Sequence, residues 1–182
     1  MDKTLKQYDS ITDKCKDIFS KKMEDYGTAW RVLRPSSITD QLYIKAKRIS
    51  TIEQTGENKV GEDVVSEYVA IVNYCVMGLV QLELGPSDSN ELSKKKVFSI
   101  YENHIKEARE LMINKNSDYG EAWREMRVSS ITDLILMKLH RTKQIEDNKG
   151  ETLISEGIDA NYQDMINYAI FAMILLSETR NN

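Results

Sequence analysis

Apolar residues recur along this chain at the spacing of an α-helix. Between residues 38 and 52 they step by four and three positions, which places them on one face of a helix. Lys45 interrupts that stripe, and residues 131–145 repeat the pattern with Lys138 at the matching position. The stripe of the first segment consists of Ile38, Leu42, Lys45, Ile49 and Ile52. This pattern predicts an all-α fold.

The two stripes belong to a larger internal repeat. Residues 25–40 return as residues 118–133, and twelve of the sixteen positions are identical. Self-similarity at a fixed period indicates a duplicated structural unit. We therefore expect one helical motif to occur twice in the same order.

Each copy is predicted to contain three helices. Gly27 and Gly120 are expected to end the first helix, because glycine readily adopts the left-handed conformation that caps a helix. Ser37 and Ser130 have capping-box spacing to the Asp three residues later, which predicts the start of the second helix. The third helix is predicted over residues 60–84 and 154–178.

Three short helices bury little apolar surface alone. The two copies are therefore expected to pack across a pseudo-two-fold axis into one helical bundle, like a homodimer fused into one chain. The predicted boundaries are residues 1–86 for the first copy, 87–93 for a linker, and 94–182 for the second copy.

Composition and charge narrow the class of protein. Apolar residues make up 41% of the 182 residues, charged residues make up 30%, and the net charge is −4. Charges of both signs are interspersed, so no basic stripe predicts binding to a nucleic-acid polymer. The longest apolar run, residues 165–176, is too short to span a membrane, and the N-terminal segment is polar. We expect a cytoplasmic monomer or homodimer that does not bind membranes, with Cys15 and Cys75 reduced in the core.

The lysines inside the apolar stripes are candidate binding residues. Lys45 and Lys138 point toward the predicted core, with Arg48 and Arg141 at one edge of the stripe. A buried lysine usually meets an anion. That anion is either an internal carboxylate or the phosphate of a ligand, and the sequence leaves both interpretations open. Under the second interpretation, all four cations bind substrate.

The third helix of the second copy carries acids on one face. Glu156, Asp159 and Asp164 lie there beside Asn167, and oxygen donors of this kind suit Mg²⁺. Acids in a first helical turn also stabilise the helix dipole, which is the alternative for Glu156 and Asp159. The matching face of the first copy keeps Glu62 but has Val65 and Ala70 in place of Asp159 and Asp164. We therefore predict one divalent-metal site per chain, formed by Glu146, Glu156, Asp159 and Asp164.

The loops between the first two helices offer further candidates. Asp118 and Tyr119 precede Gly120, and they either shape the loop or contact a substrate. Trp30 and Trp123 are interpreted as core anchors, with stacking on a nucleobase as the alternative.

Three motifs recur in both copies in the same order. They are Lys-x-x-Asp-Tyr-Gly-x-Ala-Trp, then Lys-x-x-Arg, then Asn-Tyr near the middle of the third helix, where the second copy reads Asp-x-x-Asn-Tyr-Ala. In the second copy they span Lys115 to Trp123, Lys138 to Arg141, and Asp164 to Ala169. Together they resemble the nucleotide modification associated domain family, first type. That resemblance implies a role in nucleotide metabolism or in making modified nucleotides, with a small-molecule nucleotide as the partner.

A more distant similarity is to the all-helical nucleoside triphosphate pyrophosphohydrolases of the MazG and dimeric dUTPase kind. Those bundles hold Mg²⁺ through a Glu-x-x-Glu pair and a Glu-x-x-Asp pair. Glu156 and Asp159 match the second pair, whereas Glu146 stands alone where the first pair would lie. The similarity implies a Mg²⁺-dependent pyrophosphohydrolase in which those acids and Asp164 are catalytic.

Three hypotheses follow for function. The first is the pyrophosphohydrolase, with Lys138, Arg141 and Asn167 on the substrate and Lys45 and Arg48 reaching across from the first copy. The second is a non-catalytic module that binds a nucleotide or another anion. The third is a helical scaffold in which the repeated motifs serve only the fold.

Overall fold

The structure, a computed structural model, describes residues 1–58, 63–88, 92–151 and 156–180. Within these ranges it contains helices and no strand, so the predicted all-α fold is confirmed. The elements in chain order are α1 (Asp2–Tyr26), the 3₁₀ helix η1 (Ala29–Val32), α2 (Pro35–Thr55), α3 (Val64–Leu84), α4 (Lys94–Tyr119), the 3₁₀ helix η2 (Ala122–Glu125), α5 (Val128–Asp147) and α6 (Ile158–Arg180).

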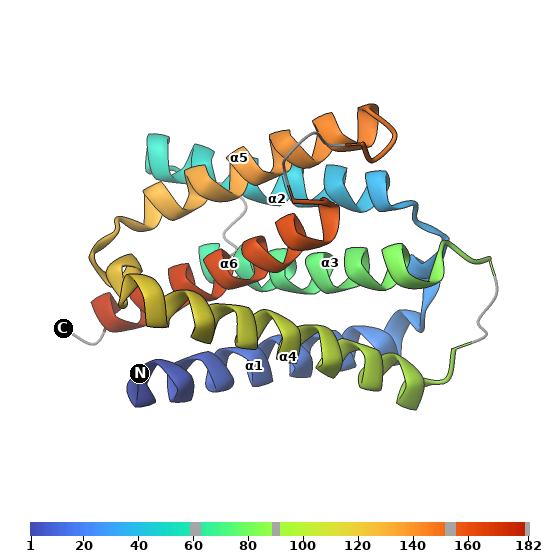
Figure 1. Cartoon of the computed structure of the whole chain (residues 1–182), viewed down its shortest axis with the longest axis horizontal. Helices are drawn as coiled ribbons and strands as arrows, with labels where there is room; N and C mark the ends of the chain where they lie inside the picture. The colour runs from blue at the N-terminus through green and yellow to red at the C-terminus, as the bar shows by residue number, and fades with distance from the viewer. Residues whose placement is uncertain (59–62, 89–91, 152–155, 181–182) are drawn as a thin grey trace.

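The order of elements repeats, as the duplication predicted. The series α1, η1, α2, α3 of the first copy matches α4, η2, α5, α6 of the second. Helices of equal rank lie together: α2 with α5, α3 with α6, and α1 with α4 (Figure 1). The α3–α6 pair occupies the middle of the bundle, with the other two pairs on either side. The two copies therefore form one bundle with a shared core.

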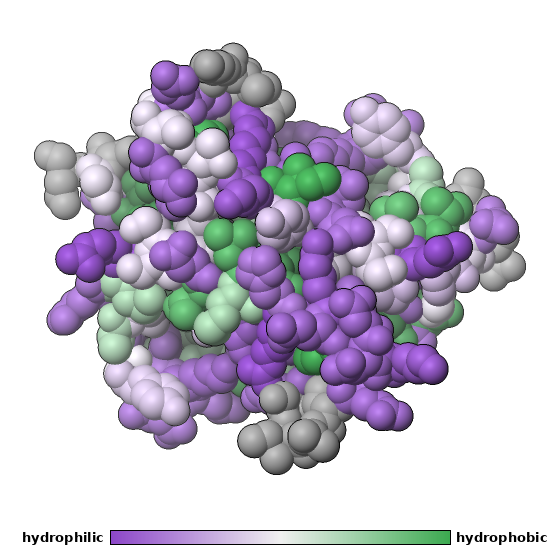
Figure 2. Space-filling model, turned by 90° about the horizontal axis from the view of Figure 1, so that it is seen from above, coloured by the Kyte–Doolittle hydropathy of each residue, from purple (hydrophilic) through white to green (hydrophobic). Residues whose placement is uncertain are grey.

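The central helices are apolar on most of their surface. Tyr68, Ile71, Tyr162 and Ile166 are completely buried there. By length and composition α3 could cross a membrane, but 67% of its apolar window is buried inside the bundle. The face over α2 and α5 is mainly hydrophilic, with small separate hydrophobic patches (Figure 2). Burial against the other helices explains the apolar character of α3 and α6.

Hydrogen bonds across the pseudo-two-fold axis occur in matched pairs. Tyr8 donates to Asn167 and Tyr101 donates to Asn73, each at 2.8 Å. A second pair joins α2 to α5, where Thr39 donates to Glu146 at 2.7 Å and Thr132 donates to Glu53 at 2.8 Å. Buried polar groups require such partners, so each copy completes the core of the other.

The ends of the helices follow the sequence signals only in part. Gly27 and Gly120 end α1 and α4 as expected, with positive φ of 60° and 62°, but their ψ of −136° and −158° differ from the predicted left-handed helical conformation. The predicted capping boxes are wrong, because α2 and α5 begin at Pro35 and Val128, two residues before the serines, and Arg34 and Arg127 at their N-caps make no side-chain cap. The first position of a helix tolerates proline, whose missing N–H has no intrahelical partner there.

The third helices begin later than the predicted 60 and 154. Asp63 caps α3, its carboxylate accepting from the N–H of Val65 at 3.2 Å. The corresponding helix α6 starts at Ile158. Residues 59–62 and 152–155, including Glu62, lie outside the described residues, as do residues 89–91 of the predicted linker.

The beginning of α1 meets the end of α6. Glu178 accepts a hydrogen bond from Gln7 at 2.9 Å and forms an ion pair with Lys3 at 2.6 Å. The start of α1 and the end of α6 lie at the same end of the bundle (Figure 1).

Candidate functional site

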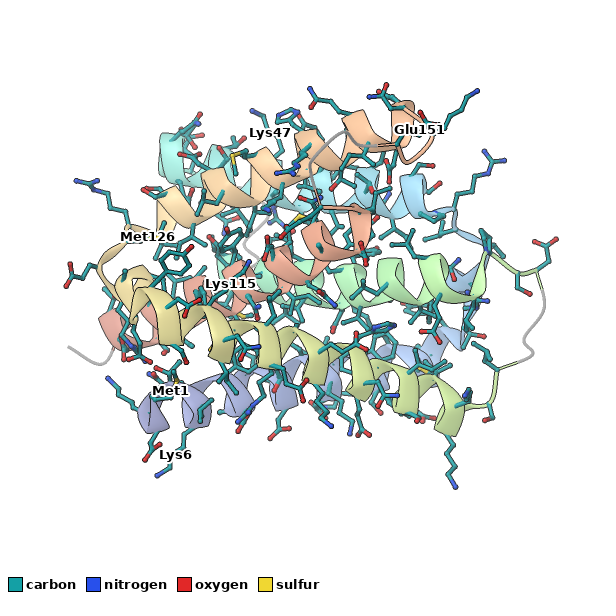
Figure 3. The ribbon with its side chains drawn as sticks, viewed as in Figure 1. Met1, Lys6, Lys47, Lys115, Met126 and Glu151 are labelled. Atoms are coloured by element: carbon teal, nitrogen blue, oxygen red, sulfur yellow. The ribbon has the colours of Figure 1, made fainter. Side chains whose placement is uncertain are left out.

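A buried carboxylate between two lysines lies near the middle of the second copy. Asp164 of α6 is 6% exposed, and its two oxygens lie 2.7 Å from the Lys138 ammonium of α5 and 2.6 Å from the Lys115 ammonium of α4. Lys138 is 9% exposed, so its inward position in the stripe is confirmed. Lys115, labelled in Figure 3, lies between α4 and α6. Three helices thus converge on one charged cluster, Lys115–Lys138–Asp164.

The electrostatics of this cluster favour an added anion. Partial burial alone would lower the pKa of Lys115, but its hydrogen bond to Asp164 and the charges of Asp164, Tyr168 and Glu156 raise it. Two ammonium groups on one carboxylate leave a net positive charge in a partly buried place. Since a charge away from water is stabilised chiefly by an opposite charge, the cluster can accept a further negative group.

The first copy contains an equivalent cluster with a different carboxylate. Glu67 of α3 is 2% exposed and pairs with both Lys45, at 3.3 Å, and Arg48. By the repeat, Glu67 matches Asn161, whereas Asp164 matches Ala70. The acid has therefore moved by one helical turn between the copies while remaining opposite the Lys-x-x-Arg motif.

Sequence reasoning missed Glu67. The comparison of the copies considered matched positions on one face, where the first copy has lost its acid at Ala70. The available signal was a single glutamate within the apolar run 64–72, one turn from the expected position. A search of neighbouring turns rather than identical positions would have found it.

The four predicted metal ligands are not brought together. Glu146 accepts from Thr39, next to the hydroxyl of Tyr162, and burial raises the pKa of its carboxyl. Asp159 is exposed and lies beside His104 and Glu107 at a shallow surface hollow. Within the described ranges no three His, Cys, Asp or Glu side chains are placed to hold a metal ion.

Glu156 is the acid that shares the surroundings of Asp164. Burial raises the pKa of Tyr168, and the charges of both Asp164 and Glu156 raise it further. Both acids also act on Lys115. Because each oxygen of Asp164 already holds an ammonium group, the residues present do not fit a preformed Mg²⁺ site.

The other predicted substrate-binding residues differ in what they contact. Arg141 is half-buried, and no carboxylate of the described residues pairs with it. Asn167 uses its amide in the core, accepting from Tyr8 and donating to the carbonyl of Ala108 at 2.9 Å. Asp118 and Tyr119 are exposed, with Tyr119 77% accessible to solvent.

Comparison with known proteins adds one finding. The sequence profile of a family described as nucleotide modification associated domain 1 matches residues 22–82 and again residues 115–176. The two matches fall in the two copies and together cover more than half of the chain. No curated protein and no solved structure matches the chain.

Proposed function

Because the chain belongs to the nucleotide modification associated domain 1 family, we propose that it binds a nucleoside triphosphate through the Lys115–Lys138–Asp164 cluster of the second copy. The phosphates contact Lys115 and Lys138, and Arg141 lies on the same helix one turn beyond Lys138. Ammonium and guanidinium groups are the usual protein partners of phosphate.

The observation that carries this proposal is the charge balance at Asp164. One carboxylate between two ammonium groups, at 2.6 and 2.7 Å, cannot neutralise both. The second lysine is 45% exposed, so it can meet a ligand without unfolding the core.

A substitution at Lys138 tests the proposal. Lys138→Met keeps the apolar stem of the side chain and removes its charge, and Asp164 keeps Lys115 as a partner. We expect affinity for nucleoside triphosphates, measured by titration calorimetry, to fall by roughly tenfold or more, since a hydrogen bond to a charged group contributes about 1.5–3 kcal/mol. Helical content should stay unchanged.

The exposed Lys95 of α4 provides the matched control. Lys95→Met removes the same charge far from the cluster and should leave affinity unchanged. Equal affinity of the Lys138→Met variant and the natural chain would contradict the proposal.

We further propose Mg²⁺-dependent hydrolysis of the bound triphosphate to a monophosphate and pyrophosphate as a second candidate function. The observation that favours it is the shared neighbourhood of Glu156 and Asp164 around Lys115 and Tyr168. Since the cluster is not a preformed Mg²⁺ site, the metal is expected to arrive with the nucleotide.

Turnover is tested by incubating the protein with a panel of nucleoside triphosphates, with and without Mg²⁺, and measuring pyrophosphate and phosphate. Asp164→Asn should reduce product release by at least about tenfold, because it removes a carboxylate that would hold the arriving Mg²⁺ beside the phosphates, and a metal at the transferred phosphate contributes several kcal/mol. Asp133→Asn, at an exposed position of α5, is the control. Binding without product at millimolar Mg²⁺ would leave the protein as a non-catalytic binding module.

A further inference from the structure

A cavity of about 460 Å³ opens in the first copy between α1, η1 and α3. Cavities of a few hundred Å³ that are mostly apolar and carry a few polar groups are typical of small-molecule sites. Most of the lining side chains are apolar or aromatic, and Lys22 is the cation among them. The lining includes Phe19, Lys22, Trp30, Ala70, Tyr74 and Met77.

The second copy fills the equivalent place with its own side chains. There the ring of Phe171 stacks on Trp123, with centroids 4.2 Å apart and planes at 4°. Beside it, the carboxylate of Asp164 meets the ammonium of Lys115 at 2.6 Å. In the second copy, α6 thus supplies both a ring that stacks on Trp123 and a carboxylate that pairs with Lys115.

The first copy keeps the tryptophan and the lysine, but α3 supplies neither a stacked ring nor a carboxylate; Trp30 has the tilted ring of Phe19 of α1 beside it, with centroids 6.3 Å apart. By the repeat, Trp30 and Lys22 match Trp123 and Lys115, whereas Met77 stands for Phe171 and Ala70 for Asp164. All four of these first-copy residues line the cavity. No carboxylate of the residues that the structure describes pairs with Lys22. The cavity therefore lies where the second copy has a stacked ring and a carboxylate.

We propose that this cavity binds a nucleoside monophosphate. The base stacks on Trp30 as Phe171 stacks on Trp123, and the phosphate meets Lys22 as Asp164 meets Lys115. Stacking suits any base, because every base has a flat π-face. The choice of a nucleotide rests on the proposed function, whereas the requirement for a flat ring with an anion rests on the second copy.

The second copy also supplies the substitutions that test this proposal. Met77→Phe should fill the cavity with a ring, and Ala70→Asp should give Lys22 an internal partner. Both changes install side chains that the same motif already accommodates, so both variants are expected to fold. The natural chain should bind at least one of AMP, GMP, CMP and UMP in titration calorimetry, and each variant should weaken that binding at least tenfold.

Two further measurements test the assignment of the site. Lys22→Met should weaken binding of the monophosphate at least tenfold, while Lys95→Met should not change it. In a Trp123→Phe background, where Trp30 is the remaining tryptophan, the monophosphate should quench the fluorescence. Free nucleoside and inorganic phosphate, each offering half of the interactions, should bind more weakly than the monophosphate.

The outcomes separate this site from the cluster in the second copy. Monophosphate binding that survives both Met77→Phe and Ala70→Asp but is lost in Lys138→Met would overturn the cavity proposal and leave the proposed function in place. Loss in the cavity variants, with Lys138→Met unaffected, would support the cavity and leave the cluster to its own test with triphosphates. Absence of binding of all four monophosphates to the natural chain would overturn the cavity proposal.

Discussion

Glu146 lies at the interface between the copies, where burial and a hydrogen bond together set the pKa of its carboxyl. Its carboxylate accepts a hydrogen bond from Thr39 at 2.7 Å. Burial raises the pKa of the carboxyl, and the hydrogen bond from Thr39 offsets this only in part. Glu53 has the same arrangement with Thr132 and the same direction of pKa shift. Repetition of the arrangement indicates a role in joining the copies.

The raised pKa predicts how Glu146→Gln changes stability with pH. Glutamine keeps an acceptor for Thr39 without a charge, so at pH 7 the variant should be at least as stable as the natural chain. As the pH falls through the raised pKa and below the ordinary value of 4.5, the folded natural chain binds its proton more tightly than the unfolded chain. The natural chain should therefore gain stability relative to the variant.

Urea unfolding of both chains at pH 7 and near pH 4 measures this difference. Glu125→Gln, at an exposed position, controls for the loss of one acidic group. A difference between the chains that moves in the opposite direction, or stays constant with pH, would contradict the assignment. If Glu146 instead takes part in turnover, the same variant would lose product release.

At individual positions the sequence predicted orientation better than partners. The step of four and three residues correctly placed Lys138 inside, because helical geometry alone decides the face. Its partner Asp164, an acid of the third helix, agrees with the expected internal carboxylate, but the second lysine on it, Lys115, comes from another helix and was not expected there. Contacts between helices depend on packing that spacing along one helix does not contain.

Among the elements, α3 and α6 pack closely together at Gly78. A Cβ atom placed on Gly78 would lie 2.7 Å from a ring carbon of Tyr162, which is completely buried. The glycine therefore makes room for the ring whose hydroxyl contacts Thr39 at 2.7 Å. The matching residue of α6 is Ala172, so the second copy already has an alanine at this position.

Gly78→Ala should destabilise the protein despite the better helix propensity of alanine. The gain from propensity is about 0.5–1 kcal/mol, whereas overpacking of a core costs roughly 1–3 kcal/mol. We expect a lower midpoint of thermal or urea unfolding. Ser99→Ala, at an exposed position of α4, measures the effect of an alanine without the clash. A stabilised Gly78→Ala variant would show that Tyr162 can move aside freely.

Helix number and order were predictable, but several helix ends were not. The apolar periodicity and the repeat correctly indicated three helices per copy. Ser37 and Ser130 carried a real capping pattern, yet both lie inside helices that start at Pro35 and Val128. Nearby Thr39 and Thr132 use their hydroxyls for bonds across the copies. Interactions between elements distant in sequence therefore mattered more for the start of these helices than the local capping patterns did.

For the whole molecule, the shared core predicts a single unfolding transition. The copies exchange buried hydrogen bonds such as Tyr8 to Asn167 and Tyr101 to Asn73, and α3 packs along α6. Neither copy has a complete core without the other, so they should unfold together. The two tryptophans, Trp30 and Trp123, report separately on the two copies.

Single-tryptophan variants make this measurable. Trp123→Phe leaves the reporter of the first copy, and Trp30→Phe leaves that of the second. Each variant, followed by fluorescence and by circular dichroism in urea, should give the same midpoint with both probes. Midpoints that differ between fluorescence and circular dichroism within one variant would show that the copies unfold independently.

Because the start of α1 lies beside the end of α6, the order of the helices along the chain can be changed without changing how they pack. Glu178 contacts both Gln7 and Lys3, so a short peptide could join the end of α6 to the start of α1. Opening the segment between α3 and α4 would then give a circular permutant in which the second copy is translated first. The helices would keep their neighbours, because the contacts between them do not depend on the order in which they are synthesised. Either copy is therefore expected to serve as the amino-terminal half of a folded chain.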